Sequence, residues 1–143
     1  MYGDSELVRR RAAALRDQGA DVRALADELV ARLDDLGWSG RTADAFRGRV
    51  LDRSRHLRVA ADRHQTAADA LAAHAVGADR ALEEIATRER RANGLVEAAR
   101  SRRAASDAGS GSVEPGDAEL LSFTPPPRGH RDWLAVELPG LDR

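Results

Sequence analysis

Cysteine and lysine are absent from this chain of 143 residues, and aromatic residues make up only 3% of it. Without cysteine, disulfides and thiolate metal ligands are excluded. No apolar run approaches the roughly 20 residues that a membrane-spanning helix needs. The first residues also lack the apolar core of a cleaved signal peptide. We therefore expect a soluble protein without membrane insertion, which uses no conventional cleaved signal if it is exported.

The sequence also lacks the patterns of a catalytic or ligand-binding centre. It has no Gly-rich phosphate loop, and no two of its four histidines have the i,i+4 spacing of a helical metal site: His56, His64, His74 and His130. The formal net charge is only -1, and no aromatic residues alternate with the arginines as base-stacking platforms would. We therefore expect no enzymatic activity, no cofactor or metal, and no nucleic-acid partner.

Two long segments rich in Ala, Leu and Arg repeat their apolar residues every seven positions. This spacing is typical of amphipathic helices whose apolar stripe packs against another helix. Gly37 is predicted to end the first helix in a left-handed conformation. The residues predicted at the helix–helix interface are Val8, Leu15, Val22, Leu29, Leu33 and Leu36 in the first segment, and Val50, Leu57, His64, Leu71 and Ile85 in the second.

The predicted fold is all-α, with an antiparallel two-helix hairpin over residues 4–105, because the two helices are joined by only a few residues. A lone hairpin leaves half of each stripe in water, and burial of a Leu or Val is worth roughly 1.5–3 kcal/mol. We therefore expect two hairpins to dimerise into a four-helix bundle. Residues 106–119, rich in Gly, Ser, Pro and Asp, predict a flexible linker. Residues 120–143 predict an irregular tail that either binds a groove on a partner or packs back across the hairpin.

The turn between the predicted helices contains Trp38-Ser39-Gly40, and Phe46 follows in the next helix. This Trp-x-Gly turn resembles the WXG-motif family, small helical hairpins exported by type VII secretion systems of actinobacteria and other Gram-positive bacteria. The resemblance covers residues 4–105. The ring of Trp38 either plugs the end of the hydrophobic core or, as the resemblance implies, forms part of a surface recognised by the export machinery.

The resemblance implies a secreted substrate or the targeting partner of a larger effector. It also implies a homodimer, or a heterodimer with another WXG-like protein or effector, that engages the type VII machinery. The family's export signal is completed by a Tyr-x-x-x-Asp/Glu motif after the second helix, whereas the only tyrosine here is Tyr2. The nearest substitute is Trp133 with Glu137 in the tail. This departure favours an alternative, a cytoplasmic helical adaptor or chaperone for a partner protein that is not itself exported.

Charge is distributed in blocks along the chain. Residues 41–63 carry seven Arg and three Asp, residues 88–103 carry six Arg and two Glu, and the residues from Ala104 onwards carry three Arg and seven acids. Such runs are either solvated helix faces or contact surfaces. In the second case the acidic tail folds back on a basic stretch, or an Arg-rich face meets an acidic partner.

His64 and His74 fall on the predicted apolar seam. They are either polar residues tolerated at the interface or the elements of a pH-sensitive one, in which protonation would place charge in the seam.

Overall fold

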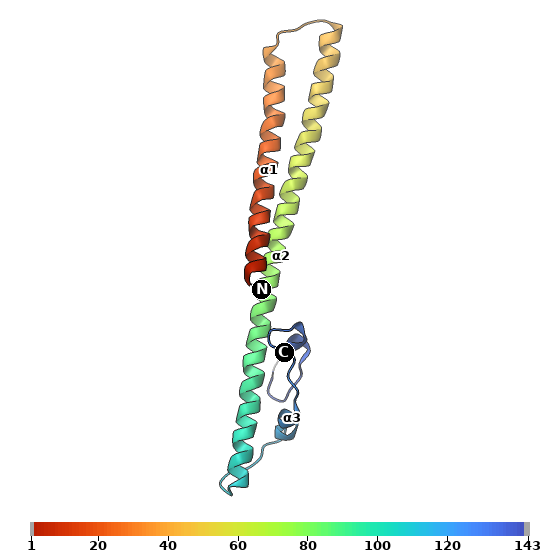
Figure 1. The fold of residues 1–143 in the computed structure, drawn as a ribbon. Helices are drawn as coiled ribbons and strands as arrows, with labels where there is room; N and C mark the ends of the chain where they lie inside the picture. Colours follow the sequence, from red (N-terminus) through yellow and green to blue (C-terminus); the bar gives the residue numbers. More distant parts are fainter. Residues whose placement is uncertain (1, 142–143) are drawn as a thin grey trace. The chain divides into compact units, whose positions relative to one another are not determined.

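The structure is a computed structural model that describes residues 2–141. It contains the helices α1 (Tyr2–Asp35), α2 (Arg41–Asp107) and α3 (Asp117–Ser122) and the 3-10 helix η1 (Arg131–Ala135) (Figure 1). No strand occurs among the described residues, and the predicted all-α class is confirmed. Over the same residues, no helix is long and apolar enough to cross a membrane.

The chain forms two compact units, of which the first ends at Ala78 and the second begins at Asp79. This boundary lies inside α2, which continues to Asp107. The division therefore differs from the predicted one, which placed residues 4–105 in one hairpin. The reason lies in the tail, which packs against the last part of α2 and forms the second unit with it.

The turn between α1 and α2 depends on two glycines with positive φ. Gly37, at φ 60°, follows the end of α1 as predicted, and Gly40 has φ 107°, a value that side-chain-bearing residues rarely adopt. The carbonyl of Gly40 accepts the N–H of Asp44 at 3.0 Å, which begins the hydrogen-bond ladder of α2. Asp44 also places a negative charge in the first turn, where it complements the helix dipole.

Within the first unit α1 runs antiparallel to the first part of α2 (Figure 1). The two helices meet along rows of mostly small residues, spaced seven apart and buried. We call these the buried rows: Ser5, Ala12, Gly19, Ala26 and Leu33 on α1, and Ser54, Ala61, Ala68 and Ala75 on α2.

The small side chains of the buried rows let the two backbones approach closely. A Cβ on Gly19 would lie 3.1 Å from the Cβ of His64 and 3.2 Å from the carbonyl oxygen of Ala61. Further along, the hydroxyl of Ser54 donates a 3.0 Å hydrogen bond to the carbonyl oxygen of Ala26, so this fully buried polar group is satisfied. A larger residue in either place would push the helices apart.

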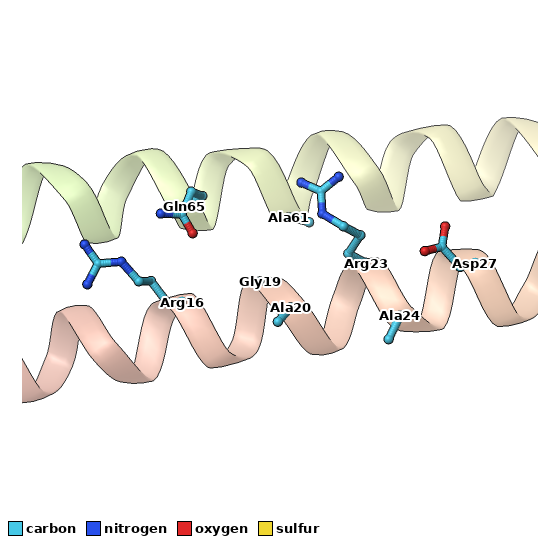
Figure 2. A pocket seen from close by; sticks show the side chains of 8 residues that line it. All are labelled: Arg16, Gly19, Ala20, Arg23, Ala24, Asp27, Ala61 and Gln65. Carbon is cyan, nitrogen blue, oxygen red and sulfur yellow. The ribbon is translucent and has the colours of Figure 1, made fainter.

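One edge of the helix pair carries ion pairs that cross from α1 to α2. They join Arg16 to Asp69, Arg23 to Asp62, Arg58 to Asp27 and Arg47 to Asp34. Figure 2 shows Arg16 and Arg23 reaching from α1 towards α2 on either side of Gly19. Because these pairs are exposed to solvent, each contributes little to the free energy of unfolding. Their value is in fixing which side of α1 meets which side of α2.

The larger residues predicted at the interface lie on the opposite edge of the helix pair. In the sequence they come three positions after a residue of the buried rows, whereas most of the ion-pairing residues come one or four positions after one. These larger residues are half-buried, and we call them the half-buried rows: Val8, Leu15, Val22 and Leu29 on α1, and Val50, Leu57, His64 and Leu71 on α2. The centre of the interface is thus formed by the buried rows, of which the predicted interface set contained Leu33.

The second unit is built on the last part of α2. The predicted interface residue Ile85 is buried there, in a cluster with Ala92, Trp133, Val136 and Leu141. The indole N–H of Trp133 donates to the carbonyl oxygen of Pro127 at 3.0 Å. The tail thus packs on its own chain, against α2 beyond Ala78.

Polar side chains of α2 hold the tail in place. Arg88 donates to the carbonyl oxygens of Trp133 at 3.1 Å and Val136 at 2.6 Å, at the end of η1. Arg102 makes a two-pronged ion pair with Asp117, whose side chain is 1% exposed. Asp117 lies within the predicted linker, residues 106–119, and its ion pair with Arg102 attaches the C-terminal end of that segment to α2.

Candidate interaction surface at the helix turn

Two adjoining hollows of about 430 and 250 Å³ lie on the first unit, close to the turn. Both are lined by Leu29 from α1 and by Phe46 and Val50 from α2. Leu33 and Leu36 complete the smaller one. We call the two together the turn-end hollow. It is where the half-buried rows of both helices reach the turn, so it confirms that these rows share one edge of the helix pair.

The aromatic residues of the predicted motif lie at this end of the helices. Trp38 is 61% exposed and Phe46 is 40% exposed, with ring centroids 6.2 Å apart in a tilted arrangement. An indole with that exposure does not plug the core of its own chain. The other interpretation, in which the ring belongs to a surface, agrees with this placement. Leu36, 47% exposed, extends the apolar area.

Arginine side chains also line the turn-end hollow. Arg49 and Arg53 lie on α2, and Arg32 lies on α1, where it is paired with Glu28. Within residues 2–141, neither Arg49 nor Arg53 has an ion-pair or hydrogen-bond partner for its side chain. The hollow therefore combines an apolar lining with two uncompensated positive charges.

The substitute for the missing tyrosine motif is placed differently. The ring of Trp133 is 1% exposed and packs edge-on to Phe123, at 6.1 Å between centroids. Glu137, four residues later, is exposed. Trp133 and Glu137 therefore do not present an exposed ring together with an exposed acid.

The histidines of the predicted seam also differ from each other. His74 is exposed, whereas His64 is half-buried and its Nδ1 lies 2.8 Å from the carbonyl oxygen of Ala60. The two do not form a common site. Among the described residues, no group of three or more His, Asp and Glu side chains is arranged to hold a metal ion.

Comparison of the chain with family models, curated proteins and solved structures finds no match. The resemblance to the WXG-motif family therefore rests on the Trp-x-Gly turn and its position between two helices.

One feature of this surface was missed by sequence reasoning. The position of Arg49 and Arg53 beside an apolar hollow was not predicted, because the sequence shows them only as two of seven arginines in residues 41–63, most of which lie elsewhere on α2. Leu25, 48% exposed, adjoins Leu29 in a neighbouring hollow and extends the apolar area along α1.

Proposed function

We propose that this chain is a type VII secretion-associated helical protein that binds a helical partner along its half-buried rows and turn-end hollow. It acts as a secreted substrate or as the targeting partner of a larger effector. The partner forms a second hairpin, and the two hairpins together make a four-helix bundle, either homomeric or heteromeric.

The observation that carries this proposal is the exposure of Trp38 beside Phe46 at the turn. Large apolar side chains gathered in one exposed area are typical of surfaces that bind another protein. The half-buried rows extend this area along both helices. Their remaining exposed area supplies a driving force for association, as burial of apolar surface is favourable by about 25 cal/mol per Å².

Export is the property to test. The tagged chain would be expressed in its native host, with and without a functional type VII ATPase, and culture medium would be compared with cells using a lysis control. We expect the protein in the medium only when the ATPase works. Retention in the cell, while another substrate of the same system is exported, would contradict the proposal.

A matched pair of variants separates the motif from general stability. Trp38→Ala removes the exposed indole, and Val59→Ala removes a side chain of similar exposure, 48%, outside the turn. We expect the first to abolish export and the second to leave it intact, with equal amounts of both proteins in the cells. Equal export of the two variants would remove Trp38 from the recognition surface.

A second function is favoured by the burial of Trp133. Because the buried ring of Trp133 is a poor substitute for the missing tyrosine, we propose as the alternative a cytoplasmic adaptor or chaperone that binds its partner through the same surface. Retention in the cell together with a stable complex between the chain and a second protein would support this alternative.

A further inference from the structure

The two edges of the α1–α2 pair differ in how their charges are balanced. On one edge, Arg16, Arg23, Arg47 and Arg58 each have an aspartate partner on the other helix. On the edge with the turn-end hollow, the lining contains Arg32 paired with Glu28, and the unpaired Arg49 and Arg53. On the first edge the arginine charges are balanced by aspartates. On the second edge Arg49 and Arg53 leave unbalanced positive charge beside apolar residues.

The positions of these arginines match the geometry of a docked helix. Arg49 and Arg53 are four residues apart and therefore lie one above the other on α2. Val50, between them in sequence, lines the same hollow with Phe46 and Leu29. A helix laid into the hollow would bury its own apolar residues against this lining, with its flanking side chains near the two guanidinium groups.

We infer that the occupant of the turn-end hollow is an amphipathic helix of a different protein, whose apolar residues are flanked by Asp or Glu. Carboxylates in these positions pair with Arg49 and Arg53, and planar guanidinium groups suit such contacts because they bind carboxylates with two parallel hydrogen bonds. The inference rests on the proposed partner binding and does not depend on secretion.

Charge argues against a second copy of this chain in the same place. Two copies joined symmetrically through the turn-end hollow would use the same patch on both sides. The positive charges of Arg49 and Arg53 on both copies would then be brought into one interface, and like charges across an interface are unfavourable. The complex is therefore heteromeric. Of the homodimer and the heterodimer left open by the sequence, the charges at the hollow favour the heterodimer.

The test uses two fluorescein-labelled peptides of about 20 residues, long enough to form a helix. Both carry Leu at positions spaced three and four apart, with Glu flanking the leucines in one peptide and Lys in the other. Binding to the full chain is measured by fluorescence anisotropy. We expect the Glu peptide to bind about tenfold more tightly than the Lys peptide, as two charge pairs of about 0.5–1 kcal/mol each would give.

Charge-reversal variants locate the effect. Arg49→Glu with Arg53→Glu should reverse the preference, so that the Lys peptide binds more tightly. Arg55→Glu with Arg63→Glu changes the net charge equally at exposed positions of α2 outside the hollow. This control should keep the preference for Glu. Phe46→Ala should weaken binding of the Glu peptide, and circular dichroism verifies that all variants keep their helices.

Three results would overturn the inference. One is equal affinity for the two peptides or binding of neither, and another is loss of the preference in the Arg55 and Arg63 control, which would indicate a general attraction. The third is a dimer of the chain alone in sedimentation equilibrium that Phe46→Ala dissociates, which would make a second copy the occupant. A dimer dissociated by Phe46→Ala would contradict this inference but not the proposed function. Failure of export would contradict the proposed function but not the binding of the Glu peptide.

Discussion

Gly19 and Gly48 both lie inside helices, but their surroundings differ. A Cβ at Gly48 would meet nothing within 4 Å, whereas one at Gly19 would press on His64 and on the carbonyl of Ala61. Glycine in a helix interior costs about 1 kcal/mol relative to alanine. Its presence at Gly19 is explained by the close approach of α2, and the structure offers no such reason at Gly48.

We therefore predict opposite outcomes for two identical substitutions. Gly48→Ala should raise the free energy of unfolding by up to about 1 kcal/mol. Gly19→Ala should lose that gain or destabilise the chain by about 1–2 kcal/mol, because the buried rows must separate. Urea denaturation followed by circular dichroism compares the two. An equal stabilisation by both would mean that the helices do not approach so closely at Gly19.

The two tryptophans differ in the same way. Trp38→Ala should change the free energy of unfolding by less than about 1 kcal/mol, because the ring is 61% exposed. Trp133→Ala should lower it by about 3–5 kcal/mol, because the ring is 1% exposed and packed against other apolar residues. Thermal and urea unfolding of dilute protein, without a partner, would measure both. A large loss for Trp38→Ala under these conditions would indicate a buried ring.

At the scale of elements, α2 and the tail are linked by the Arg102–Asp117 ion pair. The pKa of Asp117 lies below its ordinary value of 3.8. The main cause is the hydrogen bonding of its carboxylate to the Arg102 guanidinium, and the second is the hydrogen bond it accepts from the backbone N–H of Glu114. The ionised carboxylate therefore stabilises the folded state. This contribution is present above the unfolded-state pKa and is lost as the pH falls through the lower folded-state pKa.

We predict that the tail loosens in acid through this group. In a Trp38→Phe background, Trp133 is the remaining tryptophan, and its fluorescence should shift to the red as the pH falls below about 4. Asp117→Asn should show part of this shift at neutral pH and a weaker dependence in acid. This local probe is needed because the pKa of Asp69, in the first unit, is also lowered, chiefly by Arg16. An unchanged acid profile in Asp117→Asn would contradict the prediction.

At the scale of the whole molecule, the chain has two units with separate apolar clusters. In the first, the buried rows pair α1 with α2, and in the second, Trp133 and Val136 cover Ile85. Both clusters depend on residues seven apart in α2. Each unit buries its own apolar surface, so a change in one core should act mainly on that unit.

Hydrogen exchange of the Trp133→Ala variant tests this separation. We predict faster amide exchange at residues 85–99, where the tail has lost its main side chain, and unchanged exchange at residues 12–26 of α1. Mass spectrometry of peptic fragments would measure both regions in one sample. Faster exchange throughout would show that the two units unfold as one.

Much of the fold could be predicted because it depends on neighbours in sequence. The seven-residue spacing predicted both helices, Gly37 was placed correctly at the end of α1, and the acidic Asp44 marks the first turn of α2. The candidate surface was predicted less well. Trp38 and Phe46 were singled out as residues of the turn, but the exposure of their rings and the role of Arg49 depend on packing, which no local pattern encodes.

The sequence by itself determined the helical class, the position of the turn and the absence of cysteine chemistry, because helix propensity, glycine conformation and composition are local properties. Only the tertiary structure decided which row of α1 faces α2. Rows beginning at Ser5 and at Val8 both repeat every seven residues, and the row of Val and Leu has the stronger hydropathy. The small residues occupy the centre because they allow the backbones to approach, and they leave the larger side chains half-buried along one edge. The position of the tail was also decided by packing, because Trp133 is buried against Ile85 and Ala92 of α2.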